Sequence, residues 1–240
     1  DWTLNDGIRI GGSWLHSTFI DKTFFPFPFD EINQSYLTSS GNVGIIYTPT
    51  SWKFSLLTST GFRAPNVDDL AKVFDSTPGT VIVPNPDLTA EKTLNVDFNI
   101  TKFFGSQVRL EGTAFATQFY DAIVIAPSTF NGQSMIDYEG TMSQVLSAQN
   151  KGRAYLYGYS LGMRVDMTEQ LAFTGSYNYT YGRVKNDDGT ESPLDHIPPG
   201  FGRLGFQFNI SKFRSELFSN FSGWKKLADY SNSGEDNLQY

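Results

Sequence analysis

Apolar and polar residues alternate along much of this 240-residue chain. Between Leu171 and Tyr181, odd positions hold Leu, Phe, Gly and Tyr, whereas even positions hold Ala, Thr, Ser and Asn. A period of two indicates a β-strand with two unlike faces, and this one is longer than most globular strands. Its length matches a tilted strand that crosses a membrane. The same pattern starts again at Leu94, Val108, Tyr159 and Leu204.

This alternation predicts an all-β chain that forms an antiparallel up-and-down meander of about nine long strands. Helix signals are weak, and residues 67–73 could form one short helical turn inside a loop. Strands are expected at residues 7–19, 36–48, 52–62, 92–102, 107–120, 153–166, 171–183, 201–210 and 214–224.

Short and long connections take turns between these strands. Transmembrane β-barrels have short turns on the periplasmic side and long loops outside, and the pattern assigns the two ends accordingly. The long connections hold about 15 to 30 residues, against a usual median of about 4 to 6. Tight turns are expected at residues 49–51, 103–106, 167–170 and 211–213, and long loops at 63–91, 121–152 and 184–200.

The alternation alone fits two classes of protein. In a soluble β-sandwich the apolar face lies in a core, whereas in a membrane barrel it contacts lipid. Strand length favours the barrel, and so do the aromatic residues near the strand ends, among them Trp52, Tyr177 and Phe213. The longest apolar runs, such as residues 122–126, are far shorter than the roughly 18 residues of a membrane helix.

Composition argues against several functions. The 18 Lys and Arg against 25 Asp and Glu give a net charge of −7, which disfavours nucleic acid as a partner. The chain has no Cys, so it offers neither a disulfide framework nor a thiolate metal site. His16 and His196 are its only imidazoles, and no nucleophile elbow or phosphate-binding loop accompanies them. We therefore predict no enzyme activity, no cofactor and no metal site.

Four local motifs resemble those of TonB-dependent outer-membrane receptors. Residues 61–65 read Gly-Phe-Arg-Ala-Pro, and residues 85–91 are similar to Asn-Pro-x-Leu-x-Pro-Glu, with Ala90 in place of the second proline. Residues 150–158 resemble Asn-x-Gly-x-Ala-x-x-x-Gly, and residues 193–199 resemble Pro-Leu-x-x-Ile-Pro-Pro. All four follow the order of the family, at junctions between loops and strands. Proline cannot donate to a β-ladder, so the motifs also have an architectural role at these junctions.

The resemblance implies a segment of a transmembrane barrel of about 22 strands with a plugged lumen, in a Gram-negative outer membrane. Such receptors bind a scarce ligand outside, for example a ferric siderophore or cobalamin. They move it inward when the TonB protein pulls on the plug. The implied partners are TonB and the plug through the full-length receptor, outer-membrane lipid and a small extracellular ligand.

Residues 1–240 are accordingly expected to form one partial barrel domain, from the C-terminal part of the barrel, without the plug and the remaining strands. The open edges of such a segment would promote self-association. The alternative function is a soluble β-sandwich binding or adhesion module, whose long loops at one end would form the binding face.

Five residues are candidates for ligand contact. Arg63 stands where a strand enters the first long loop. Aromatic side chains at a barrel mouth can also hold an apolar ligand, although they can equally pack on neighbouring loops. The aromatic candidates, between the first two strands, are Phe24, Phe25, Phe27 and Phe29.

Four charged residues lie on the polar face of two predicted strands. In a barrel that face lines the lumen, so these side chains would contact the plug or the transport pathway. They are Arg109, Glu111, Arg164 and Asp166.

Overall fold

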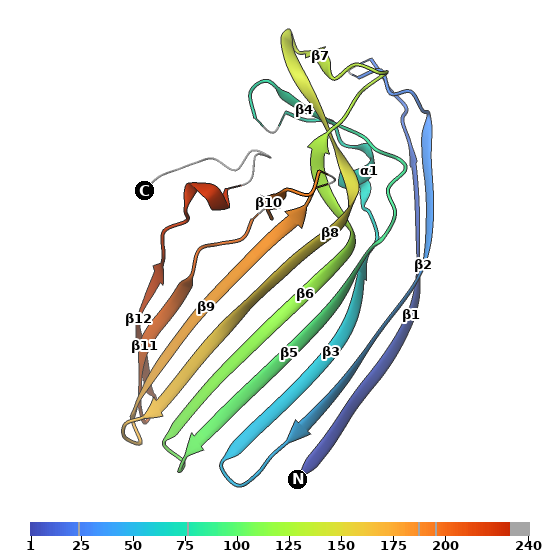
Figure 1. Cartoon of the computed structure of the whole chain (residues 1–240). Coiled ribbons are helices and arrows are strands. Elements are labelled where there is room, and N and C mark those ends of the chain that lie inside the picture. Colours follow the sequence, from blue (N-terminus) through green and yellow to red (C-terminus); the bar gives the residue numbers. More distant parts are fainter. Residues whose placement is uncertain (24, 76, 187, 195, 231–240) are drawn as a thin grey trace.

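The computed structural model describes residues 1–230 except 24, 76, 187 and 195. One curved, predominantly antiparallel sheet dominates the fold, and its long strands follow each other in chain order (Figure 1). The expected all-β meander is therefore confirmed. The long strands are β1 (Trp2–Thr18), β2 (Glu31–Tyr47), β3 (Trp52–Arg63), β5 (Glu91–Phe104), β6 (Val108–Pro127), β8 (Thr141–Asp166), β9 (Leu171–Lys185), β11 (Phe201–Ile210) and β12 (Phe213–Ser222).

Short elements lie in the long loops. The helix α1 (Val67–Ala71) confirms the helical turn expected there, and Asn66 and Asp69 form a capping box at its start. None of the described helices is long and apolar enough to span a membrane. The other short elements are β4 (Thr80–Val83), β7 (Met135–Tyr138), β10 (Glu191–Pro193) and the 3₁₀ helix η1 (Leu227–Asp229).

The strands β6 and β8 are longer than the sequence predicted. Part of residues 121–152, expected to be a loop, continues their ladder from Ala122 opposite Lys151 to Pro127 opposite Leu146. Residues 145–148 are all buried, so both faces of β8 are covered here, and β4 pairs with its edge. A strand covered on both faces needs no alternation, so the period-two pattern disappears. β1 and β2 likewise begin earlier than expected, at Trp2 and Glu31.

The tight turns and the long loops lie at opposite ends of the sheet, as the alternation of short and long connections predicted. The four tight turns lie at one end, at the bottom of Figure 1, and the loops that carry α1, β4 and β7 lie at the other. The buried core is also at this loop end, where Leu70, Val81 and Val145 are fully enclosed. We call this end the loop layer: residues 19–30, 64–90 and 128–148.

The faces of the sheet are reversed relative to a soluble protein. On β5 the outward residues Leu94, Val96 and Phe98 are 36%, 39% and 46% exposed. The inward residues Asn95 and Asp97 are half-buried on the concave side. A sandwich would bury the apolar face under a second sheet, whereas the described residues form one sheet. The structure therefore excludes the β-sandwich alternative.

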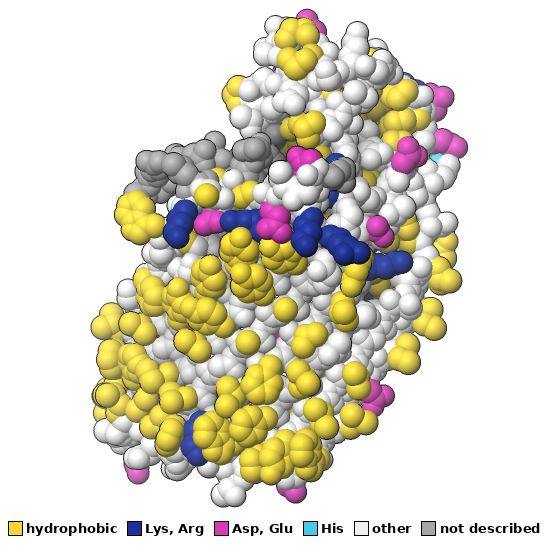
Figure 2. All heavy atoms as spheres, viewed as in Figure 1, with side chains coloured by type: hydrophobic (Ala, Val, Ile, Leu, Met, Phe, Trp, Pro, Cys, Tyr) yellow, Lys and Arg dark blue, Asp and Glu magenta, His cyan; other side chains and the backbone are white. Residues whose placement is uncertain are grey.

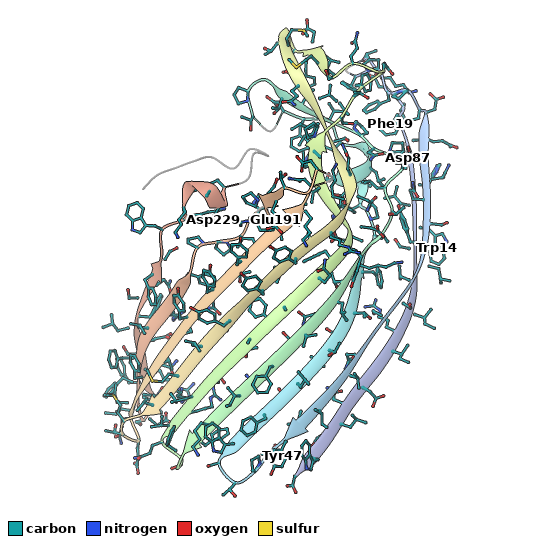
Figure 3. The ribbon with its side chains drawn as sticks, viewed as in Figure 1. Trp14, Phe19, Tyr47, Asp87, Glu191 and Asp229 are labelled. Atoms are coloured by element: carbon teal, nitrogen blue, oxygen red, sulfur yellow. The ribbon has the colours of Figure 1, made fainter. Side chains whose placement is uncertain are left out.

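Aromatic side chains border the apolar surface at both ends. At the tight-turn end, the rings of Trp2 and Tyr47 stack at 4.3 Å, and Tyr47 is labelled in Figure 3. Nearer the loop layer, Tyr159 and Tyr179 lie 5.7 Å apart on β8 and β9. Figure 2 shows hydrophobic side chains spread over the strands between the two ends. Two aromatic belts around an apolar band are typical of a barrel wall in a membrane.

We expect an arginine on the outward face to destabilise the sheet in lipid. Leu161, which is 52% exposed between the two belts, is the test position. Leu161→Arg should cost about 2–4 kcal/mol, because the charge would lie in the apolar part of the bilayer. Urea unfolding of the protein folded in phospholipid vesicles measures this cost.

Ser160→Arg is the matched control, because Ser160 is the adjacent residue on the inward face. It loses one hydrogen bond, from Ser160 Oγ to Asn178 at 2.8 Å, which is worth about 1 kcal/mol. Equal losses for the two variants would contradict the assignment of the faces.

Candidate functional site

The loop layer is a packed structure. Leu88, at the turn before β5, is 2% exposed and belongs to a cluster with Ile32, Leu70 and Ala148. These residues come from β2, α1 and β8, so the loop of residues 64–90 folds against strands on both sides of it. Burial of this kind holds the loop in one arrangement.

Arg63 lies at the centre of an ion-pair network at the border between the long strands and this layer. Its Nη1 donates to Asp69 Oδ2 at 2.8 Å, and its Nε donates to Glu91 Oε1 at 3.1 Å. The second oxygen of Glu91 accepts the backbone N–H of Ile123 at 2.9 Å. The network therefore joins the end of β3, the helix α1, the start of β5 and β6.

The surroundings of the three charges differ. The Glu91 and Asp69 side chains are only 12% and 20% exposed, whereas that of Arg63 is 42% exposed. Sequence reasoning selected Arg63 but missed both of its partners. The available signal was their position inside or beside the two receptor-like motifs, at residues 61–65 and 85–91.

Side-chain amides hold the turn of residues 85–89. Asn150 accepts from Thr89 N at 2.8 Å and donates to Thr89 O at 3.0 Å, and Asn85 donates to Ala148 O at 2.8 Å. From β2, the Tyr36 hydroxyl donates to Leu88 O at 2.9 Å. The turn is thus tied to β8 and to the concave face of β2, which gives the asparagines of two motifs a structural role.

A shallow depression opens beside this turn. It measures about 550 Å³, and its lining is mostly polar. Asp87, labelled in Figure 3, contributes a carboxylate, and Gln149 is tied to Pro127 O at 2.9 Å. The full lining is Asn85, Asp87, Pro127, Ser128, Thr129, Ser147 and Gln149.

The aromatic candidates gather on the loop layer. Phe25 is 5% exposed, and its ring lies 4.7 Å from that of Phe130. Phe27 and Phe29 are half-buried, with rings 4.5 Å and 5.4 Å from Phe19. Phe24 lies outside the described residues. The structure packs Phe25 under neighbouring loops and leaves Phe27 and Phe29 partly open to solvent.

The last receptor-like motif packs over a glycine of β9. Leu194 N donates to Gly182 O at 3.2 Å. A Cβ built on Gly182 would lie 2.7 Å from Ile197 Cδ1 and 3.2 Å from Leu194 Cβ. A side chain at Gly182 would therefore displace the Pro-Leu-x-x-Ile segment from the wall.

The four lumen candidates lie together on the concave face near the tight turns. Arg109 and Arg164 are direct cross-strand partners. Arg109 pairs with Glu111 at 3.7 Å, and Arg164 pairs with Asp166 at 2.7 Å. Arg164 also donates to Gln207 Oε1 at 3.2 Å, a contact that the sequence did not indicate. All four charged side chains are between 39% and 50% exposed, so this wall can still contact another surface.

The chain matches the family model of the TonB dependent receptor-like β-barrel over residues 1–239. It belongs to this family. The receptor-like motifs thus identified the family correctly, and the expected outer-membrane location is confirmed. Since the family consists of outer-membrane receptors, the prediction that the chain is not an enzyme is also confirmed.

A curated relative of this TonB-dependent receptor barrel is also an outer-membrane protein. The receptor barrel is 27% identical over 204 residues to the "Iron-regulated outer membrane virulence protein" of Vibrio cholerae serotype O1, covering 82% of this chain. The chain spans 28% of the length of that relative.

Solved structures share the fold of the receptor barrel. The copper transporter OprC has a TM-score of 0.66 at 16% identity, with 91% of this chain and 31% of that one covered. The FrpB iron transporter from Neisseria meningitidis (F3-3 variant) has a TM-score of 0.61 at 17% identity, with 92% and 30% covered.

We expect Arg63→Ala to loosen the loop layer of the receptor barrel. The variant leaves the half-buried carboxylates of Asp69 and Glu91 without their cation, which should cost about 1–3 kcal/mol. Faster hydrogen exchange at the amides of α1 and at Ile123 measures the effect.

Arg109→Ala is the control, because its ion pair is longer, at 3.7 Å, and half-exposed. It should change stability by less than about 1 kcal/mol and leave exchange in the loop layer unaltered. Unchanged exchange in Arg63→Ala would show that the network does not hold the loop.

Proposed function

We propose that this chain forms part of an outer-membrane receptor that takes up a scarce ligand by TonB-coupled active transport. Iron bound to a siderophore or a similar chelator is the favoured ligand, and cobalamin is another. The observation that carries the proposal is the barrel wall itself: a polar concave face that leads away from a packed loop layer. The names of similar proteins support iron, including the "siderophore receptor PirA from Pseudomonas aeruginosa".

The ligand would be bound at the loop layer. Arg63 offers a partly exposed guanidinium, and Phe27 and Phe29 offer partly exposed rings. A guanidinium suits anionic oxygen atoms, and aromatic rings suit flat apolar groups, so together they fit a metal chelate with charged and aromatic parts. Phe24 and Phe25 belong to the same proposal, with Phe25 as support from below.

The lumen wall would contact the plug. Arg109, Glu111, Arg164 and Asp166 present both signs of charge near the tight turns, at exposures that allow further contacts. Charged and polar side chains of a plug could bind there, and TonB would then act through that plug. In this proposal residues 1–240 are one partial barrel domain of the full-length receptor.

Uptake by the full-length receptor tests the transport function. Cells that carry the intact gene should accumulate radioactive iron from one or more ferric chelates, and deletion of the gene or of tonB should remove that uptake. Cobalamin and glycans, tested in parallel, identify the ligand class. Uptake that persists without TonB would contradict the proposal.

We further propose that residues 1–240, when isolated, self-associate. Within the described residues, β1 pairs only with β2 and β12 only with β11, so each sheet edge leaves backbone groups unpaired. Light scattering of the refolded chain should give a dimer or a larger species. A monomer whose β1 and β12 amides exchange slowly would argue against this.

A further inference from the structure

The strand register aligns three cations on the outward face. Lys92 on β5 lies opposite Tyr120 on β6, Tyr120 opposite Arg153 on β8, and Arg153 opposite Lys185 on β9. Directly opposed residues share one face of a sheet, so the four side chains point to the same side. We call Lys92, Arg153 and Lys185 the basic row.

The basic row lies at the outer border of the apolar band. All three of its residues are exposed. On the same face of β8, Tyr157 and Tyr159 lie two and four residues beyond Tyr155, toward the tight turns, and both are exposed. Figure 2 shows a row of charged side chains along the upper edge of the apolar surface.

Carboxylates neutralise the positive charge along only one part of this border. Arg183 pairs with Asp229 at 2.5 Å, and Glu191 accepts the Tyr155 hydroxyl at 3.0 Å; Figure 3 labels both carboxylates. In the described part of the chain, neither Lys92 nor Arg153 forms an ion pair. Lys185 lies 5.9 Å from the ring of Tyr155. Glu191 is directly opposite Lys185 in the register of β10 and β9, so this carboxylate lies beside one of the three cations. The basic row keeps a net positive charge at Lys92 and Arg153.

This arrangement costs energy unless a further anion lies beside Arg153. Like charges directly opposite each other in a sheet are destabilising, and Arg153 and Lys185 are such a pair, which Glu191 offsets on the Lys185 side only. The three cations cross three strand spacings, roughly 14 Å, which is wide enough for more than one phosphate group. Guanidinium and ammonium groups are the side chains that bind phosphate best.

We propose that the basic row binds the phosphate groups of a phosphorylated lipid in the outer leaflet, whose acyl chains lie on the apolar surface below. The outer border of a membrane protein is where lipid headgroups meet the wall, and basic side chains there attract anionic lipids. Tyr157 and Tyr159 suit the level between headgroup and chains, because their rings are apolar and their hydroxyls polar. The inference depends on the outer-membrane location and not on the transported ligand.

Lipid binding by the purified full-length receptor tests the proposal. Native mass spectrometry in detergent, with diphosphoryl lipid A as the probe, measures the dissociation constant. The variant Arg153→Gln/Lys185→Gln should bind about 30-fold more weakly, at about fivefold for each cation removed near the membrane surface. Binding that stays within twofold of the parent would overturn the proposal.

The control variant is Lys53→Gln/Lys102→Gln, which removes two positive charges at the other end of the wall. Lys53 is opposite the inward-facing Thr101. Lys102 faces outward at the tight-turn border, where its Nζ lies 4.3 Å from the Trp52 ring. The control should bind the lipid as the parent does. An equal loss of lipid affinity in both variants would show that the effect depends only on net charge. It would overturn the proposal that the lipid binds at the basic row.

Two further binding measurements use the unmodified receptor, so they test the proposal even if the double variant does not fold. Dephosphorylated lipid A should bind at least tenfold more weakly than the diphosphoryl form; equal binding would show that phosphate is not recognised. Millimolar inorganic phosphate should not displace the lipid, because the acyl chains add apolar contact. Complete displacement would identify a free-phosphate site instead.

Discussion

The fold depends on one constraint: within a lipid bilayer, every backbone N–H and C=O must find a partner inside the protein. The continuous ladder from β1 to β12 meets this constraint for its interior strands. Once the ladder is fixed, side chains can only point to one of two faces. The apolar residues take the lipid side and the polar residues take the lumen side, so no core forms between sheets.

As a consequence, the buried core lies in the loop layer. There Leu70, Val81 and Val145 are enclosed, and β4 and β7 extend the sheet beyond the apolar band. Arg63 connects this layer to the wall, through carboxylates that belong to α1 and β5. The loop layer, which is proposed to bind the ligand, therefore has a buried apolar core like that of a soluble protein. Such a core gives a binding surface a defined shape.

Charge follows the same geometry. On the concave face, Arg164 and Asp166 pair with each other and remain half-exposed. Outside, charges avoid the middle of the band on β8 and β9 and collect at its border, where Arg183 binds Asp229 and the basic row begins. The cations thus form two populations, one on the concave face and one at the border of the apolar band.

The sequence by itself determined the long strands, their faces, the tight turns and the family. These properties are local, because a period of two or a turn signal is read within a few residues. The extensions of β6 and β8 escaped prediction because the surrounding loops cover both of their faces, and covered faces carry no alternation.

Only the tertiary structure decided which distant residues meet. Arg63 and Glu91 are 28 residues apart, and Asn85 and Ala148 are 63 apart. The basic row needs the register of four strands at once, and a shift of one residue in β5, β8 or β9 would turn its cation to the other face. Register is a property of the whole ladder, so no single segment of the sequence contains it.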